Sequence, residues 1–238
     1  MRLDVLLGLV GKSRREMKYL IKTGQVTIDG QRAASYHLNV DTGLQEIRVE
    51  QDLLRIGQET YFILNKPKGV VSACQDKEHQ TVVDLLAPVD RKDRIYPVGR
   101  LDRDTEGLLL LTTNGPLGYQ LLHPSYHVTK TYEVVVNGPL LADANDFFAQ
   151  GVVFLDGKTC QPAQLEIIET GDEQSKARIT IVEGKFHQVK KMFLAYGVKV
   201  TYLKRISFGP FHLDDALPVG HYRALTRQEI EWIKTYLG

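Results

Sequence analysis

The chain has 238 residues, of which 43% are hydrophobic and 25% charged, and its formal net charge is +1 at pH 7. This composition excludes a disordered or low-complexity chain and leaves enough apolar material for a sizeable core. The only early apolar stretch, residues 5–10, is interrupted by glycine and follows Asp4, which excludes a signal peptide or a membrane span there. We therefore expect a globular, cytoplasmic protein.

The first residues predict a small helical unit. Residues 3–10 place apolar side chains at helical spacing, and Ser13 with Glu16 has the form of a capping box that begins a second helix. Gly24 is typical of the residue that ends a helix, and residues 26–28 then read as a short strand. These elements predict an N-terminal module with its own small core.

Positive charge is concentrated in this module. Residues 1–34 hold seven Lys or Arg and three acids, a net charge of +4, so the rest of the chain carries −3. Arg14, Lys18 and Lys22 stand four residues apart and share one face of the second helix. Such a row fits a phosphate backbone, although an ordinary solubilising face has the same pattern.

Strand-like runs predominate from Tyr61 onward. We predict strands at 61–64, 108–111, 132–136, 163–168 and 177–182, and helices at 142–148, 186–196 and 227–237. The chain shows neither a regular β-α-β alternation nor a Gly-rich phosphate loop, which argues against a doubly wound nucleotide-binding fold. The pattern predicts an α+β fold with a mixed, mostly antiparallel sheet. We place the domain boundary near Gly57, which gives domains 1–57 and 58–238.

Metal and disulfide chemistry are not expected. Cys74 and Cys160 are the only cysteines, far apart and without a C-x-x-C pair, so we interpret both as reduced thiols. His123 and His127 have a spacing that metal ligands use, but Pro124 lies between them and no ligand cluster accompanies them. We expect structural histidines, no metal and no cofactor.

The most informative stretch runs from residue 96 to 115. It places Asp102 between Arg100 and Arg103, directly before Leu108–Leu111, a run typical of a strand buried on both faces. A turn is predicted at Asn114-Gly115. The stretch reads as a charged loop anchored to a rigid strand, which is a natural place for a functional site. A solvated charge run above a core strand is the alternative.

The residues G-R-L-D at 99–102, with T-x-G-L-L-L-L-T at 105–112, resemble the signature of the pseudouridine synthases, specifically their RsuA-type branch, which acts on ribosomal RNA. Further stretches agree in order, at 65–69, 130–132, 184–192, 203–205 and 209–210. The N-terminal strings R-L-D, S-R-R-E and G-x-V-x-I-D-G resemble an S-four-like (S4-like) RNA-binding module. The resemblance covers nearly the whole chain and implies a cleft across the middle of the sheet.

The resemblance implies four catalytic residues. Asp102 is the expected nucleophile, since a carboxylate can attack the anomeric carbon or stabilise positive charge there. Removal of a sugar proton by this aspartate is an open alternative. Lys190, in H-Q-V-K, matches the basic partner of the aspartate, a position where many members have arginine. Tyr132 matches the tyrosine that stacks on the target base, and Leu203 matches an apolar residue beside the aspartate.

RNA binding is expected from five cations. Arg14, Lys18 and Lys22 form the row on the N-terminal module. Arg100 is placed to fill the space left by a flipped nucleotide or to bind its phosphate. Lys66, in N-K-P-K-G, is expected either to reinforce the pocket or to contact RNA.

The sequence thus predicts an isomerase that converts a uridine of small-subunit (16S) ribosomal RNA to pseudouridine, without a cofactor. The expected partner is ribosomal RNA within an assembling small subunit, with no membrane, and the expected state is a monomer. A large-subunit (23S) synthase, a non-catalytic RNA-binding assembly factor and an RNA glycosidase are the alternatives. Asp104 or Glu106 would be the second carboxylate of a glycosidase or a magnesium ligand, but no partner residues complete either site.

Overall fold

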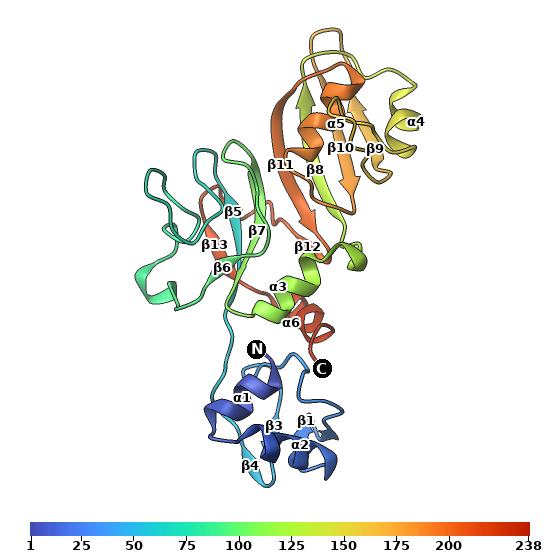
Figure 1. Ribbon diagram of the computed structural model, residues 1–238. Helices are drawn as coiled ribbons and strands as arrows, with labels where there is room; N and C mark the ends of the chain where they lie inside the picture. Colours follow the sequence, from blue (N-terminus) through green and yellow to red (C-terminus); the bar gives the residue numbers. More distant parts are fainter.

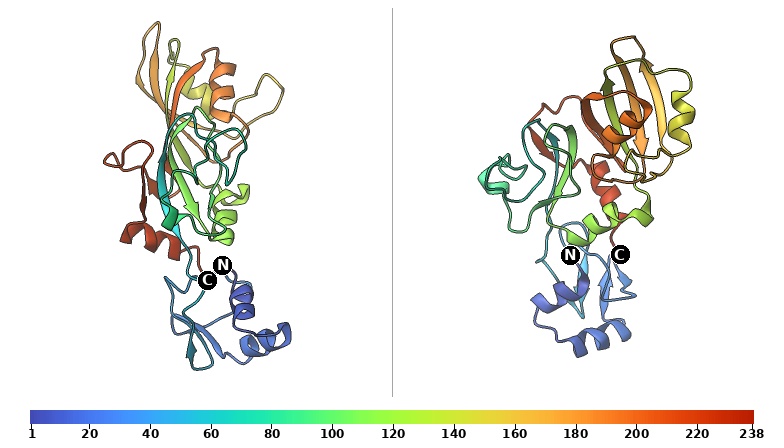
Figure 2. Two further views of the ribbon diagram at one scale, coloured as in Figure 1. Left: turned by 90° about the vertical axis from the view of Figure 1, so that its left-hand side faces the viewer. Right: turned by 45° about the horizontal axis from the view of Figure 1, so that its top comes forward.

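The computed structural model describes residues 1–238 and has two parts, a small N-terminal module and a larger domain built on one long sheet (Figure 1). The two termini lie close together where the parts meet, as all views show (Figures 1 and 2). The longest helices have nine residues, so none of them could span a lipid bilayer.

The N-terminal module packs two helices on a small sheet. Helix α1 spans Leu3–Leu9 and α2 spans Arg14–Lys22. The sheet has the order β2-β1-β3-β4, from strands Gln31–Arg32, Val26–Ile28, Ile47–Val49 and Asp52–Leu53. The predicted capping box is confirmed, because the Glu16 amide donates to Ser13 Oγ and the Ser13 amide donates to the Glu16 carboxylate. Twelve buried apolar residues form a core separate from that of the larger domain.

The larger domain is built on a nine-stranded sheet. Its main path has the order β13-β5-β7-β11-β8-β10-β9, with β6 (Tyr96–Pro97) beside β7 and β12 (Phe211–His212) beside β11. The path strands in chain order are β5 Tyr61–Lys66, β7 Glu106–Thr112, β8 Lys130–Val136, β9 Gln164–Glu169, β10 Ser175–Ile181, β11 Val200–Phe208 and β13 Tyr222–Ala224. All pairs are antiparallel except β7 with β11. The mixed, mostly antiparallel α+β prediction is confirmed.

The parallel joint between β7 and β11 divides the sheet into two halves. Only two residue pairs hold it, Lys204 with Glu106 and Arg205 with Gly107. Gly107 has φ +106°, and a Cβ there would come within 2.2 Å of the Arg205 carbonyl oxygen. Only glycine permits this approach. The halves diverge beyond the joint (Figure 1), so the loop before β7 opens toward β8 and β11.

The leucines of β7 are buried on both faces, as predicted. Leu109 and Leu111 belong to the largest core cluster, together with residues of β8, β10 and α5. Leu108 and Leu110 belong to a third cluster on the opposite face, with Leu117 of α3. The strand is therefore a rigid support for the charged loop that precedes it.

Four helices cover the larger domain. They are α3 Gly115–Leu122, α4 Ala144–Ala149, α5 Gln188–Tyr196 and α6 Arg227–Lys234, with short 3-10 turns at Pro88–Asp90 and Pro124–Tyr126. The predicted turn at Asn114-Gly115 is wrong, because these residues begin α3. The Asn114 side chain accepts from the Leu117 amide, and a proline stands in the first turn of the helix. Both are signals of a helix start.

A buried polar network joins the two parts. The Tyr61 hydroxyl donates to Asp41 at 2.8 Å and accepts from the Asn114 side-chain amide at 3.0 Å. The amides of Gly43 and Glu59 donate to the other oxygen of Asp41. Burial raises the pKa of both Asp41 and Tyr61 above their ordinary values. For Asp41, the effect of burial outweighs the hydrogen bonds, which act to lower its pKa. Residues of both parts share these bonds, so the module is packed against the larger domain rather than tethered loosely.

Candidate active site

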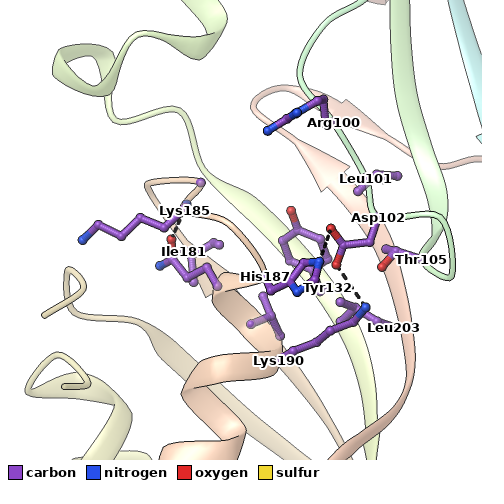
Figure 3. A pocket seen from close by; sticks show the side chains of 13 residues that line it. Arg100, Leu101, Asp102, Thr105, Tyr132, Ile181, Lys185, His187, Lys190 and Leu203 are labelled. Atoms are coloured by element: carbon purple, nitrogen blue, oxygen red, sulfur yellow. Dashed lines mark hydrogen bonds and ion pairs between the residues drawn. The ribbon is translucent and has the colours of Figure 1, made fainter. Parts of the chain in front are cut away.

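The predicted site residues meet in a pocket at the joint of the two half-sheets (Figure 3). Asp102 comes from the loop before β7, Tyr132 from β8, Leu203 from β11 and Lys190 from the first turn of α5. These residues are up to 101 positions apart in the sequence, yet all line one pocket. The fold therefore brings together the four residues that the motifs singled out.

Two basic side chains flank the Asp102 carboxylate. Lys190 Nζ lies 3.0 Å from Oδ2, and His187 Nε2 lies 3.5 Å from Oδ1. The ion pair expected between Lys190 and Asp102 is present. It is only partly buried, with side-chain exposures of 25% for Lys190 and 27% for Asp102. The carboxylate is thus open to a ligand while its negative charge is stabilised.

Lys190 is shared between two carboxylates. Its ammonium also contacts Asp104 Oδ1 at 2.6 Å, although the Asp104 side chain is 70% exposed. Burial works to lower the pKa of Lys190, but the hydrogen bonds to Asp104 and Asp102 outweigh it, and the pKa is raised. The hydrogen bond from Lys190 holds the pKa of Asp104 below its ordinary value. Sequence reasoning missed Asp104 as a partner of Lys190.

His187 was also missed as a neighbour of the aspartate. It precedes α5 with φ +53°, the left-handed region that non-glycine residues seldom adopt. Its ring stacks on Phe186 with centroids 3.8 Å apart. Unusual backbone of this kind concentrates at functional sites, because the surrounding structure must stabilise it. His187 lies just before α5 and Lys190 lies in its first turn, and both side chains reach Asp102.

Lys66 supports the Asp102 loop through hydrogen bonds to backbone carbonyls. Its side chain is fully buried, and Nζ donates to the carbonyls of Pro67 at 3.0 Å, Asp102 at 3.1 Å and Thr105 at 2.9 Å. Burial lowers its pKa to about 8. Of the two roles expected of Lys66, its burial favours reinforcement of the pocket over an RNA contact. The observed contacts match that role.

The far wall of the pocket is apolar. Tyr132 and Leu203 are 8% and 6% exposed, and both also belong to the main core cluster. Both line the pocket together with Asp102 (Figure 3). A flat aromatic ring and an aliphatic side chain around one carboxylate suit an unstacked base and exclude water from it.

The remaining acids of the loop have partners of their own. Glu106 accepts a hydrogen bond from the Tyr202 hydroxyl at 2.8 Å, and Asp104 is held by Lys190. No group of three or more His, Cys, Asp or Glu residues is arranged to hold a metal ion. His123 bonds Ser125 through Nδ1 at 2.6 Å, and His127 ends the short helical turn after it.

The predicted RNA-binding cations lie in two places. Arg100 is exposed and lines the pocket beside Asp102, extending from the same loop without touching its carboxylate (Figure 3). Arg14, Lys18 and Lys22 are exposed on α2 of the N-terminal module, away from the pocket. The pocket continues into a wider groove lined by Arg103, Lys185 and Phe186. A groove with cations and an exposed aromatic ring fits single-stranded nucleic acid.

Comparison with known proteins agrees with this geometry. Residues 60–195 match the family of RNA pseudouridylate synthases, and residues 1–45 match the S4 domain. The chain is 44% identical to an RNA pseudouridine synthase of Bacillus subtilis, YtzG, described as uncharacterized, over 97% of each chain. It is 39% identical to the ribosomal small subunit pseudouridine synthase A of Escherichia coli, over 97% of this chain and 98% of that protein.

A solved structure described as a pseudouridylate synthase superposes with a TM-score of 0.68. It is 35% identical, with 97% of this chain and 98% of that chain covered. Both the sequence relatives and this structure extend over the N-terminal module as well as the larger domain. With the pocket geometry, these matches show that the chain belongs to the RsuA-type branch of the RNA pseudouridylate synthases, with an S4 domain at its N-terminus.

Proposed function

We propose that this enzyme converts a uridine of small-subunit (16S) ribosomal RNA to pseudouridine, with Asp102 as the nucleophile. The observation that carries the proposal is the Asp102 carboxylate, which lies beside Lys190 and His187 and lines one pocket with Tyr132 and Leu203. The small-subunit target is supported by the names of relatives such as the Escherichia coli protein.

The reaction is an isomerisation and consumes no cofactor. The bond from N1 of uracil to C1′ of the ribose breaks, the base turns, and C5 forms the new bond to C1′. The proton leaves C5 and N1 gains one, so atoms and electrons balance. Asp102 attacks C1′ and forms a covalent intermediate, which the rotated base then displaces. The Lys190 ammonium lies 3.0 Å from the carboxylate and offsets its negative charge in the partly buried pocket.

The other residues position the substrate. The Tyr132 ring stacks on the extruded uracil, Leu203 excludes water beside C1′, and Arg100 fills the space that the nucleotide leaves. Lys66 fixes the loop that carries Asp102 through its bonds to loop carbonyls. The S4 module, residues 1–57 in our division, binds RNA through Arg14, Lys18 and Lys22, and the catalytic domain is 58–238.

The substrate in the cell is the RNA of an assembling small subunit, so the enzyme takes part in ribosome biogenesis in the cytoplasm, as a monomer. The test maps pseudouridines in total ribosomal RNA from cells with and without this gene. Loss of one site in 16S RNA, restored by the wild-type gene and not by Asp102→Asn, is expected. Loss of a 23S site instead contradicts the small-subunit target, and an unchanged map contradicts the function.

In vitro product analysis separates the remaining alternatives. The purified enzyme should leave the mass of the RNA unchanged while one uridine becomes pseudouridine. A glycosidase would release free uracil, and a binding factor would leave every uridine intact.

A further inference from the structure

A second pocket adjoins the active site and shares three residues with it, Arg100, Tyr132 and Gly184. Its walls come from the end of α3 and residues 122–124, from β8, from β11 and from residues 182–184. Two further cations line it, Lys130 of β8 and Arg205 of β11. The proposed reaction uses neither of them.

Lys130 and Arg205 are both buried without a carboxylate partner. Lys130 is 8% exposed and Arg205 is 2% exposed, and neither lies within 4.0 Å of an acidic oxygen. Lys130 Nζ donates to the Val128 carbonyl at 2.7 Å, and Arg205 Nε donates to the Leu108 carbonyl at 2.8 Å. Arg205 Nη2 is buried and has no hydrogen-bond partner at all. Each cation therefore retains donors that the protein leaves unused.

The protein offsets these charges only in part. The two cations lie 5.4 Å (Lys130) and 5.0 Å (Arg205) from the centre of the Phe208 ring, which attracts both but neutralises neither. Burial and the nearby Arg205 charge lower the pKa of Lys130 to about 8. The only acid that lines the pocket, Glu183, is paired with Lys185 at 3.1 Å and accepts from the Gln188 side chain. Buried cations without counter-charge are costly, so such a pocket favours an anion.

We propose that this pocket binds a backbone phosphate of the RNA next to the extruded nucleotide. The assignment rests on the proposed function for the identity of the RNA. The proposed function also places the extruded base against Tyr132, so the flanking phosphates lie near that ring. The pocket shares the ring and Arg100 with the active site. The unused donors of Lys130 and Arg205 suit phosphate oxygens, which form charge-assisted hydrogen bonds with both.

A free phosphate ion has the same chemistry as this phosphate group, so the test has two arms. The first measures thermal melting of the full-length protein in inorganic phosphate and in chloride at equal ionic strength. Phosphate should raise the melting temperature of the wild type and of Lys130→Arg, but not of Lys130→Met. Lys176→Met is the matched control, since Lys176 is an exposed cation on β10 that pairs with Glu169 outside the pocket, and it should behave as wild type. An equal shift in all four proteins overturns the site.

The second arm asks whether RNA supplies the phosphate. RNAs containing the mapped uridine carry one neutral methylphosphonate at each flanking position in turn, and their affinities are measured. At one position the wild type and Lys176→Met should lose about tenfold in affinity, near the low end for a charge-assisted hydrogen bond. Lys130→Met should bind that RNA and the unmodified RNA with equal affinity. The loss of sensitivity in this variant shows that the Lys130 side chain and that phosphate interact, as in a double-mutant cycle.

The outcomes separate the anion site from the enzymatic function. A phosphate shift in the first arm without a sensitive position in the second means a free-anion site and overturns the RNA assignment. A loss of the same size in Lys130→Met as in wild type also overturns it. Conversion of the unmodified RNA by the wild type, measured in the same samples, tests the proposed function alone.

Discussion

The cations of the S4 module and those of the cleft differ in their surroundings. Arg14, Lys18 and Lys22 are exposed on one helix, and none of them has an acidic oxygen within 4.0 Å. In the cleft, Lys66 is fully buried and donates to three carbonyls within 3.1 Å, while Lys190 lies between two carboxylates. The same residue types thus stand in a solvated row in one region and in fixed positions in the other.

This difference predicts two kinds of behaviour. Exposed cations act through their summed electrostatic field, which salt screens. Each of them therefore adds a small share to RNA affinity, and that share depends on ionic strength. Cleft cations act through single contacts in a region that water only partly enters, so each substitution has a large effect that is nearly independent of salt. The following predictions test whether the two regions separate in this way.

The largest effect is expected at Asp102. Asp102→Asn keeps the shape of the side chain but removes the charge and with it the proposed nucleophile, so turnover should fall by roughly ten-thousandfold, as for a key group of a catalytic unit. Folding and RNA affinity should change little, because the carboxylate is partly exposed and makes no contact expected to bind RNA. Single-turnover pseudouridine formation and RNA binding measured on one preparation check this. Turnover above a few per cent of wild type would contradict the role.

The next effect is expected at Lys190. Lys190→Met leaves Asp102 and Asp104 without their shared cation, so turnover should fall by roughly a hundredfold, the scale for removing one stabilising electrostatic interaction from an active site. Lys190→Arg keeps the charge and should recover much of the activity. The decrease should persist at high salt, because the pair is partly buried.

The control for Lys190 is its neighbour. Lys191 pairs with Asp156 at 3.3 Å on the outer side of α5 and does not line the Asp102 pocket. Lys191→Met should therefore change only RNA affinity. Single-turnover rates and melting curves of the three variants are compared side by side. If Lys190→Met and Lys191→Met have the same single-turnover rate, Lys190 does not act as the partner of Asp102 in catalysis.

Local patterns predicted most of the fold. Amphipathic spacing and the capping box located α1 and α2, and the apolar run located β7. They failed for β11, where Lys204-Arg205 looks like a charged surface segment, whereas Arg205 is 2% exposed. They also failed for α3, where Gly115-Pro116 was interpreted as a turn. Burial of a charge and the choice between a turn and a helix start depend on tertiary contacts that no local window contains.

The site was predicted through its motifs rather than through physics alone. Asp102, Tyr132 and Lys190 come from different elements, and only the fold brings them together. Asp104 and His187 were missed because their contacts depend on where α5 begins relative to the loop. The H-Q-V-K motif, which contains His187 as well as Lys190, was the usable signal for His187. For Lys66 the sequence left two roles open, reinforcement of the pocket and an RNA contact, because a lysine is almost never fully buried unless it is paired.

The row on α2 provides the salt-dependent half of the comparison. Replacing Arg14, Lys18 and Lys22 together by glutamine should reduce the slope of log affinity against log salt by roughly 0.7 to 0.9 for each phosphate that the row no longer neutralises. Substitution is a cleaner test than removal of residues 1–57, because the module shares the buried Asp41–Tyr61 network with the larger domain.

Melting temperature and single-turnover rate at saturating RNA should stay close to wild type in this triple variant. Filter binding or fluorescence anisotropy over a series of salt concentrations gives the slope. A slope equal to that of wild type would remove the RNA-binding role of the row and with it the contrast between the two regions.

The smallest effect is a pH dependence of stability at Lys130, measured without phosphate. Its pKa is about 8 in the folded protein and 10.5 ordinarily. Below pH 8 both states carry the charge, and folding must bury it. Between pH 8 and 10.5 the unfolded chain holds the proton that the folded protein has released, so the contribution of this group to stability rises with pH. Lys130→Met removes the free-energy cost of burying this charge, which is greatest below pH 8 and absent above pH 10.5.

Lys130→Met should therefore unfold at higher urea concentration than wild type at pH 7, with a gain on the order of 1 to 3 kcal/mol, since one pKa unit corresponds to about 1.4 kcal/mol. The gain should shrink at pH 10. Lys66 titrates in both proteins, so its contribution cancels in the difference. Lys176→Met should show the same difference from wild type at both pH values. A destabilised Lys130→Met at pH 7 would mean that the buried ammonium is already neutralised by the protein, which would remove the reason for an anion in the second pocket.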